Sequence, residues 1–499
     1  MAHPDAPPVP DIRIHATNTA GERQGAAYVL YWMVAARRTR FNFALQRAVE
    51  LADHHRLPLV VFEPLRCGYR WANHRIHRFV LDGMADNQAA LAARSVAYYP
   101  YVEPEEGKGR QLLEALAANA AVVVTDTYPC FFVPRMVRAA AAALDVRLEE
   151  VDSNGVIPLR AVPKAYSRAF DFRRFLHKEL TRHIDDRPLA EPLAARAPSP
   201  TLEQLVSAEL LDQWPPASAA LLAGATAELS ALPIDADVPP SRIRGGAVAG
   251  GRALDVFLEQ GLSRYSERNH PDRSVASGLS PYLHFGHVSA HEVVGTVLDD
   301  AEWTAPHPPL KATGSRSGWW GLSEDIEGFL DEIITWRELG YSYCWHRPDH
   351  DTYESLPGWA LKSMDEHRED PRPELYSLEQ LENAQTSDPI WNAAQRQLRA
   401  EGVIHNYLRM LWGKRIYEWS PTPEEAWRRL EHLNNRWSLD GRDPNSYSGI
   451  GWVMGRFDRA WGPERPIFGK LRYMTSGSTQ RKLKLKQYLA RWGEQPRLF

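Results

Sequence analysis

The sequence predicts an α/β domain with a parallel, Rossmann-like sheet, followed by an all-α domain. The first 160 residues alternate short apolar runs with amphipathic stretches, which is the pattern of a parallel sheet covered by helices. From residue 252 to residue 499 the apolar residues follow a helical period, with almost no alternating strand pattern. The chain of 499 residues is also too long for one ordinary core, so more than one domain is expected.

Five apolar runs in the N-terminal part are expected to form the strands of the sheet. Amphipathic stretches near residues 41–55, 75–94, 109–118 and 134–144 alternate with these runs and are expected to be helices. The first run continues into YWMVAARRTR and not into G-x-G-x-x-G, so a standard dinucleotide site is not expected in this domain. The predicted strands cover residues 26–32, 57–64, 95–102, 120–127 and 146–152.

Composition shifts divide the chain into three expected parts. An α/β domain covers residues 1–160, an interdomain connection covers 161–250, and a helical domain covers 251–499. The connection is rich in Ala and Pro from residue 187 onward, which is typical of a long linker with some helix. Residues 303–321, rich in Gly, Pro and Ser, are interpreted as a surface insertion between helices.

The overall composition excludes several classes of protein. With 44% hydrophobic and 24% charged residues, the chain is typical of globular proteins and not of disordered or fibrous ones. Three cysteines cannot form a disulfide framework in a chain of this size, and no two have zinc-ligand spacing. The N-terminus lacks the features of a signal peptide, and no apolar run is long enough to cross a bilayer. We therefore expect a cytoplasmic protein without a membrane partner.

Tryptophan and positive charge are both concentrated toward the C-terminus. Of the 17 tryptophans, 14 lie between Trp303 and Trp492, and residues 403–499 contain 18 Lys/Arg against 9 Asp/Glu. A basic, aromatic-rich region in a chain of net charge −4 favours a face that binds a polyanion. An ordinary solvated charged surface is the alternative interpretation.

Several segments of the C-terminal half could contribute to a site, although each also has a purely structural interpretation. Ser280 is a good N-cap before Pro281, and such a helix start can bind an anion, but capped helix starts are common. Glu332 and Trp336 are four residues apart and Trp412 and Trp419 are seven apart, so each pair shares a helical face, as core residues also do.

Two further segments have open interpretations. The polar loop 438–445 could serve a small-molecule site or be a plain turn. His284, His287 and His291 have spacings that a metal site could use, but packing or hydrogen bonding within a helical core explains them better. No metal site is predicted.

Six further segments occur in order along the C-terminal half: SGLSPYLHFG, FLDEIITWRELGYSYC, IWNAAQ, HNYLRMLWGKRIYEW, LNNRWSLDGRDPNSYSGIGW and RPIFGKLRYM. Together they resemble a class II cyclobutane pyrimidine dimer photolyase, of the photolyase/cryptochrome family, and the resemblance covers roughly residues 252–475. It implies a deoxyribodipyrimidine photo-lyase that binds FAD in its helical domain and repairs UV-damaged DNA by light-driven electron transfer. The chain is expected to be a monomer.

The resemblance also implies a role for individual residues. Tyr265, Ser277, Gly278, Leu279 and Ser280 would hold the FAD phosphates, while Arg337, Asp440 and Asp443 would fix the flavin and ribose ends. Arg409 would pair with Asp440, and Asn434 would face the flavin N5. Glu332 would hydrogen-bond the dimer in a pocket lined by Trp336, Met410 and Trp452. Trp412, Trp391 and Trp419, in that order, would conduct electrons between flavin and surface, and basic residues including Arg456 and Arg472 would contact DNA phosphates.

Other functions are compatible with parts of this pattern. A cryptochrome-like blue-light photoreceptor has the same fold and flavin, and a photolyase-like protein could act on another lesion. A redox flavoprotein or nucleic-acid-binding protein without photochemistry would not need the three tryptophans. A second, antenna chromophore could be a deazaflavin, another flavin, or absent.

Overall fold

The computed structural model describes residues 7–194, 199–273, 275–306 and 310–494. The chain forms two compact units, and each unit gathers segments that are far apart in the sequence. The domain boundaries expected at residues 160 and 250 stay predictions. The first unit contains Met1–Pro163, Lys178–Asp255 and Gly278–Leu310, and the second contains Lys164–His177, Val256–Ser277 and Lys311–Phe499.

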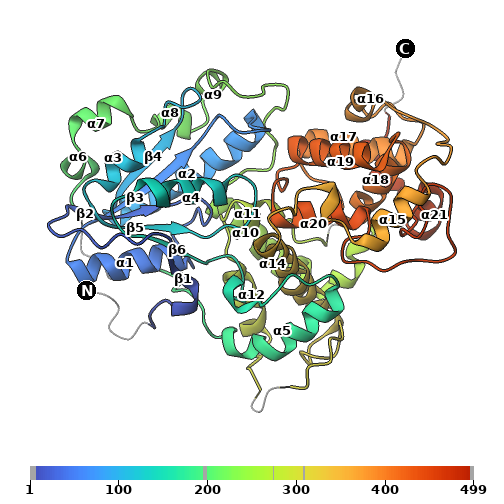
Figure 1. The fold of residues 1–499 in the computed structure, drawn as a ribbon, viewed down its shortest axis with the longest axis horizontal. Coiled ribbons are helices and arrows are strands. Elements are labelled where there is room, and N and C mark those ends of the chain that lie inside the picture. The colour runs from blue at the N-terminus through green and yellow to red at the C-terminus, as the bar shows by residue number, and fades with distance from the viewer. Residues whose placement is uncertain (1–6, 195–198, 274, 307–309, 495–499) are drawn as a thin grey trace. The chain divides into compact units, whose positions relative to one another are not determined.

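A six-stranded sheet forms the centre of the first unit (Figure 1). Its strand order is β1-β6-β5-β2-β3-β4, and all neighbours run parallel except the antiparallel pair of β1 and β6. All five predicted strands are confirmed, whereas β1, a three-residue edge strand, had no apolar run to predict it. The strands are β1 (Ile14–Ala16), β2 (Tyr28–Trp32), β3 (Leu59–Leu65), β4 (Ala97–Val102), β5 (Ala120–Asp126) and β6 (Leu148–Val151).

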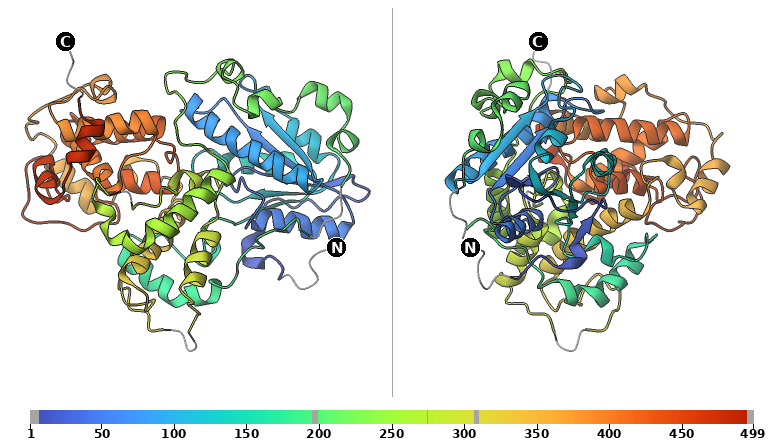
Figure 2. Two further views of the ribbon diagram at one scale, coloured as in Figure 1. Left: turned by 180° about the vertical axis from the view of Figure 1, so that it is seen from behind. Right: turned by 60° about the vertical axis from the view of Figure 1, so that its left-hand side comes forward.

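Helices cover both faces of this sheet, as Figure 2 shows from two further sides. On one face, Val29 and Tyr31 of β2 pack in one core cluster with Phe43 from α1. On the opposite face of the same strand, the Tyr28 hydroxyl donates to the carbonyl of Leu116 in α3 at 2.7 Å. A parallel sheet buried on both sides explains why its strands are continuous apolar runs. The helices of this unit are η1 (Asp11–Arg13), α1 (Phe43–His55), α2 (His74–Ala93), α3 (Leu112–Ala117), α4 (Val133–Ala143), η2 (Leu159–Ala161), α6 (Leu202–Leu205), α7 (Ala208–Gln213), α8 (Ala219–Leu222), α9 (Thr226–Ser230), α11 (Ser280–His284) and α12 (Ala290–Asp300), and α5 (Ala169–His183) and α10 (Ala247–Gln260) are shared with the second unit.

The loop after β2 binds a carboxylate of its own chain. Asp126, at the end of β5, accepts hydrogen bonds from the backbone N–H groups of Val34, Ala35 and Ala36 at 2.8–3.0 Å and from the Tyr31 hydroxyl at 2.7 Å. In dinucleotide-binding folds the corresponding turn uses free N–H groups to bind a pyrophosphate. Here Asp126 occupies those donors, which is consistent with the missing glycine motif.

The three spaced histidines lie in separate segments and not on one helical face. His284 Nδ1 lies 3.2 Å from the Tyr128 hydroxyl, and His287 Nδ1 accepts a hydrogen bond from the backbone N–H of Gly246 at 2.9 Å. His291 packs edge-on against Phe43. Within the described ranges, no group of three or more His, Cys, Asp and Glu side chains is placed to hold a metal ion.

The second unit is helical, and no strand occurs in its described part, which confirms the predicted all-α region. Three of its helices begin with a polar N-cap followed by proline: Asp388-Pro389, Thr422-Pro423 and Asp443-Pro444. The described helices are η3 (Leu262–Asn269), α13 (Glu324–Leu330), η4 (Asp331–Trp336), α14 (Arg337–His346), η5 (Tyr353–Ser355), α15 (Gly358–Glu366), α16 (Leu378–Glu382), α17 (Pro389–Glu401), α18 (Asn406–Glu418), α19 (Pro423–Trp437), α20 (Pro444–Val453), α21 (Ser476–Lys482) and α22 (Lys486–Trp492). None of the helices in the described part of the chain is long and apolar enough to cross a membrane.

Part of the expected surface insertion is anchored to the second unit. Trp319 is buried and stacks on the His177 ring, with centroids 4.4 Å apart, and the backbone N–H of Gly314 donates to His177 Nδ1 at 3.2 Å. Burial lowers the pKa of His177 to about 4, so the ring is neutral and can accept this bond. The described residues between α12 and α13 are thus irregular, as expected, but one of the tryptophans packs like a core residue. Residues 307–309 of the expected insertion lie outside the described residues.

Candidate functional site

Three tryptophans of the second unit form a continuous, buried series of rings. Trp391 of α17 lies parallel to Trp412 of α18, with centroids 6.5 Å apart and an interplanar angle of 1°. Trp391 also meets Trp419, the C-cap residue of α18, edge to face at 5.4 Å. Each of the three side chains is at most 3% exposed. The structure therefore brings together the three residues that were expected to conduct electrons, in the expected order.

The outer end of this series differs from the expectation. Trp419 is 0% exposed, so it does not reach the surface itself. Tyr376, a half-buried residue in the loop before α16, meets the Trp419 ring edge to face at 5.1 Å. Sequence reasoning missed Tyr376, because it lies in an irregular loop 43 residues before Trp419 and no spacing connects the two.

The expected ion pair between Arg409 and Asp440 is present beside the inner end of the series. Arg409 is one helical turn before Trp412 on α18, and its Nη2 lies 3.0 Å from Asp440 Oδ1. Asp440 begins a tight turn in which Arg442 has a left-handed φ of 67° and donates its backbone N–H to Asn435 Oδ1 at 2.8 Å. A side chain at Gly441 would collide with the backbone of Asn434 and Asn435, so this turn requires glycine there.

A second charged group forms around Tyr341, which sequence reasoning did not single out. The guanidinium of Arg337 lies 4.2 Å from the centroid of the Tyr341 ring. The Tyr341 hydroxyl donates to Asp443 Oδ2 at 3.1 Å, and Asp443 also caps α20. Arg337 and Asp443, both expected near the flavin, are thus linked through one buried tyrosine.

The amide of Asn434 is held within the helix pair α19 and α20. Asn434 is 5% exposed, donates to the Ser446 hydroxyl at 2.5 Å and accepts a bond from the Ser438 hydroxyl at 3.4 Å. These contacts fix its orientation. That it faces a flavin stays a prediction.

The expected phosphate-binding residues are divided between the two units. Tyr265 and Ser277 belong to the second unit, whereas Gly278, Leu279 and Ser280 belong to the first. Gly278 has a φ of 65°, a conformation that favours glycine. The expected N-cap was one residue off, because α11 starts at Ser280 itself and Leu279 occupies the cap position.

Glu332 and Trp336 lie in η4, a stretch of π-helix and not of α-helix. Such stretches have a wider turn and occur frequently at functional sites. Arg268, which also lies over the Tyr265 ring, donates to Glu332 Oε1 at 3.1 Å. Burial raises the pKa of Glu332, and the charge of Arg268 opposes that shift. Trp336 and Glu332 are both partly exposed, as a contact with a ligand requires.

Two basic side chains lie near the ring of Trp452 in α20. Lys414 Nζ is 5.4 Å and Arg472 Cζ is 5.5 Å from its ring centroid. Lys414 is 1% exposed and donates to the backbone carbonyl of Val453 at 2.5 Å; desolvation lowers its pKa to about 7. Sequence reasoning missed this lysine, because lysines are rarely buried. Met410, on the same helix as Lys414, is half-buried.

The expectation that Arg456 contacts DNA is wrong. Arg456 is 1% exposed, and its guanidinium donates to the carbonyls of Tyr447 and His350 at 3.0 and 2.9 Å and to the Ser355 hydroxyl. A side chain with these internal partners supports the core and cannot reach a phosphate.

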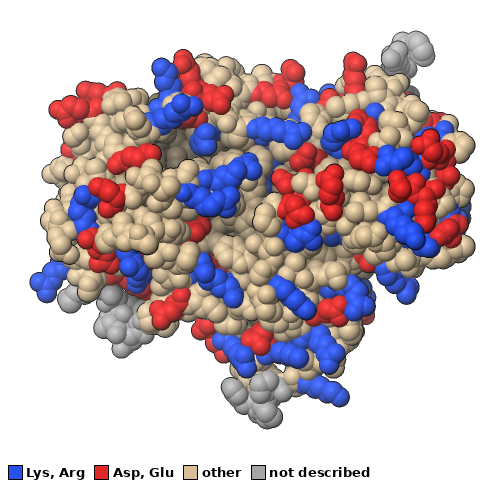
Figure 3. Space-filling model, viewed as in Figure 1, with Lys and Arg blue, Asp and Glu red and all other residues tan. Residues whose placement is uncertain are grey.

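Arg472 remains a candidate for a phosphate contact. Its side chain is 37% exposed and paired with Asp458. On the face drawn in Figure 3, acidic and basic side chains alternate over the C-terminal helices, so a continuous basic surface is not seen there.

Comparisons with known proteins agree with this fold. A family profile described as DNA photolyase matches residues 29–197. The deoxyribodipyrimidine photo-lyase of Methanothermobacter thermautotrophicus is 33% identical over 93% of this chain and 94% of its own length, and that of Arabidopsis thaliana is 32% identical over 93% and 88%.

Solved structures show the same fold at low sequence identity. The archaeal photolyase of Sulfolobus tokodaii, solved with two FAD molecules, has a TM-score of 0.63 at 14% identity and covers 93% of this chain and 89% of its own. The cryptochrome of Synechocystis has a TM-score of 0.61 at 14% identity, with coverages of 93% and 88%.

Fold and sequence agree, and the similarity along nearly the whole chain shows that this chain belongs to the photolyase/cryptochrome family. Its similarity to several deoxyribodipyrimidine photo-lyases along nearly the whole chain confirms the expectation of an enzyme of the photolyase class. The expected monomeric state and cytoplasmic location stay predictions.

Proposed function

We propose that this chain is a class II cyclobutane pyrimidine dimer photolyase, which binds FAD and repairs UV-damaged DNA with blue light. The observation that supports this most directly is the buried series Trp412, Trp391, Trp419, which begins one helical turn from the Arg409–Asp440 pair. Binding of a nucleic acid does not by itself require a series of closely spaced, solvent-excluded indole rings.

The side chains around the series fit the chemistry of a flavin dinucleotide. Arg409 and Arg337 offer positive charge toward a flavin that is negative when reduced, and Asp440 and Asp443 offer acceptors for ribose hydroxyls. Asn434 offers an amide that can accept a hydrogen bond from a flavin N–H. When bound, FAD would supply the one-electron chemistry that none of these side chains can supply.

The pocket expected for the lesion has residues suited to a flipped-out pyrimidine dimer. Trp336 and Trp452 offer flat apolar faces, and Met410 offers an adaptable apolar one. Because burial raises the pKa of Glu332, its carboxyl group holds a proton more readily and can donate it in a hydrogen bond to a base carbonyl. Such a bond strengthens as negative charge builds up on the base.

The test starts with an absorption spectrum of purified protein, which identifies a flavin and any antenna chromophore. Reduced protein is then illuminated with blue light in the presence of an oligonucleotide containing one thymine dimer or one (6-4) photoproduct. Repair of the dimer alone supports the proposal. Failure to repair either lesion by flavin-loaded, reduced protein would contradict it.

The Trp412→Phe variant tests the proposed electron path separately. It should retain FAD and repair DNA after chemical reduction, but light-driven reduction of its oxidised flavin should be lost. Unchanged photoreduction in this variant would remove Trp412 from the path.

A cryptochrome-like photoreceptor is the second candidate, since the fold is also that of the Synechocystis cryptochrome. This candidate predicts light-driven flavin reduction without dimer repair by chemically reduced protein. The same repair experiment therefore separates the two functions.

A further inference from the structure

The three indole N–H groups of the tryptophan series have no base to receive their protons. Trp391 Nε1 donates to the backbone carbonyl of Trp412 at 3.0 Å, and Trp412 Nε1 donates to Gln395 Oε1 at 2.9 Å. Trp419 Nε1 is buried and has no hydrogen-bond partner among the described residues. Carbonyl and amide oxygens are far weaker proton acceptors than a carboxylate. An oxidised tryptophan of this series therefore keeps its N–H proton and its positive charge.

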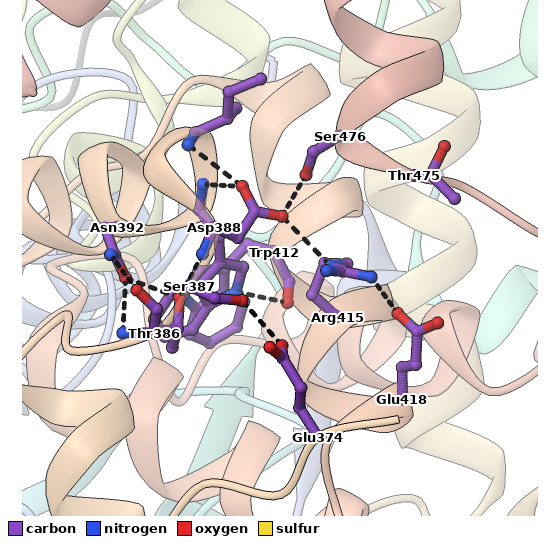
Figure 4. Close-up of polar contacts among 12 residues, drawn as sticks. Glu374, Thr386, Ser387, Asp388, Asn392, Trp412, Arg415, Glu418, Thr475 and Ser476 are labelled. Atoms are coloured by element: carbon purple, nitrogen blue, oxygen red, sulfur yellow. Dashed lines mark hydrogen bonds and ion pairs between the residues drawn. The ribbon is translucent and has the colours of Figure 1, made fainter. Parts of the chain in front are cut away.

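The surroundings of Trp419 also disfavour positive charge on its ring. The Arg415 guanidinium lies 4.4 Å from the Trp419 ring centroid, and like charges at that distance repel. Figure 4 shows Arg415 between Asp388 and Glu418, two carboxylates that offset part of this effect. Removal of the positive charge through Tyr376 avoids this repulsion.

Tyr376 differs from the tryptophans because its O–H group has a base. Its hydroxyl donates to Glu374 Oε2 at 2.9 Å. The same carboxylate accepts from the Ser387 hydroxyl at 2.7 Å, which Figure 4 shows, and the backbone N–H of Ser387 donates to the Tyr376 oxygen at 2.9 Å. Both side chains are half-buried, so the pair lies near solvent.

We propose that Glu374 is the proton acceptor for Tyr376 at the outer end of the series, an inference that rests on the photochemical function proposed above. One electron passes from Tyr376 to oxidised Trp419, which returns to its resting form. The phenolic O–H bond breaks, and an O–H bond forms on Glu374 Oε2. Tyr376 becomes a neutral radical, and Glu374 becomes a carboxylic acid. The initial oxidant is the photoexcited flavin, and a thiol reductant from solution restores Tyr376.

This step gives the separated charge a longer lifetime. While the positive charge is on a protonated tryptophan, the electron can return through rings that are in contact. Once the proton is on Glu374, return of the electron also requires return of the proton. A base within hydrogen-bond distance typically accelerates such a transfer by a factor of about 100 or more.

The test compares wild type with Glu374→Gln, Tyr376→Phe and Glu379→Gln. Glu379 is exposed, three residues from Tyr376, and serves as the matched control for loss of one negative charge. Laser flashes on flavin-loaded protein, in H₂O and D₂O, measure formation of tryptophan and tyrosine radicals. Repair of a thymine dimer by chemically reduced wild type is measured separately, because it does not depend on photoreduction. Melting temperatures verify that all variants are folded.

We expect Glu374→Gln to slow tyrosine-radical formation after the laser flash about 100-fold, Tyr376→Phe to abolish it, and Glu379→Gln to leave it unchanged. Wild type should show slower radical formation in D₂O. A wild-type rate and isotope effect in Glu374→Gln would overturn the inference, since a purely structural carboxylate predicts only reduced stability. Absence of a tyrosine radical in flavin-loaded wild type would also overturn it. If chemically reduced wild type does not repair the dimer, the proposed function fails, while radical formation after the laser flash still decides the role of Glu374.

Discussion

Replacing Lys414 by methionine should change how the stability of the protein depends on pH. The Lys414 ammonium is buried, with one backbone carbonyl as acceptor and with Asp458 and Arg472 as its charged neighbours. Desolvation lowers its pKa from 10.5 to about 7. In the unfolded chain the lysine is protonated up to about pH 10, so between these values unfolding takes up one proton. Linkage then requires that stability increases as the pH rises.

The size of the effect follows from the shift. Each pKa unit corresponds to about 1.4 kcal/mol, so the buried lysine costs about 5 kcal/mol when protonated at low pH. Between pH 7 and pH 9 the wild type should gain about 2 kcal/mol relative to Lys414→Met. Lys414→Met also loses the hydrogen bond to the Val453 carbonyl, which lowers its stability by about 1–3 kcal/mol relative to wild type. This loss is the same at each pH, because the neutral amine of the wild type also donates the bond.

Urea denaturation at pH 7, 8 and 9 measures this difference, with Lys484→Met, at an exposed position, as control. The difference between wild type and Lys414→Met should change with pH, whereas that between wild type and Lys484→Met should not. Parallel curves for Lys414→Met and wild type would show that Lys414 keeps an ordinary pKa, and the desolvation argument would be refuted.

Three further predictions concern residues of the candidate site. Glu332→Gln should lower the repair yield per photon modestly and Glu332→Ala more strongly, at unchanged FAD content; lost FAD with a normal yield in the remaining holoprotein would indicate a structural role. Arg472→Gln should reduce the slope of log affinity for damaged DNA against log salt by about one, which salt-dependent binding measures. Arg456→Gln should leave that slope unchanged. It should instead lower the stability by about 3 kcal/mol in a denaturation experiment, because it leaves buried acceptors without a donor. Arg409→Ala should weaken FAD binding at least tenfold, or about 1.4 kcal/mol, because Asp440 loses its partner; equal FAD retention on dialysis would contradict the role of the pair.

The elements that could be predicted from the sequence are those whose local residue pattern directly reflects their position in the fold. The five predicted strands are largely buried, so each is marked by an apolar run, and D-P and T-P pairs mark three helix starts. Strand β1 could not be predicted, because Ile14–Ala16 is short and only partly buried. The π-helix η4 was also missed, since the sequence DEIITW is equally compatible with an ordinary helix.

Within the site, the errors concern polar residues whose environment depends on tertiary packing. Arginine and lysine are usually exposed, so Arg456 was expected at a DNA-binding surface, and nothing in the sequence indicates that Lys414 is buried. Their buried positions depend on acceptors from distant segments, such as His350, which is 106 residues from Arg456. Tyr376 and Glu374 were missed for a related reason: their contacts with Trp419 and Ser387 arise from the folding of an irregular loop.

The spacing of Trp412 and Trp419 explains why this series needs two helices. Seven residues advance an α-helix by about 10 Å, which is too far for two indoles on one face to meet directly. Trp391 from α17 fills that gap and contacts both rings, so the path depends on how α17 packs against α18. Asp388 controls this packing: it caps α17 by accepting the N–H of Trp391 at 3.1 Å, and it pairs with Arg415 of α18 at 3.2 Å (Figure 4). One carboxylate therefore couples the backbone position of the middle ring to the helix that holds the other two.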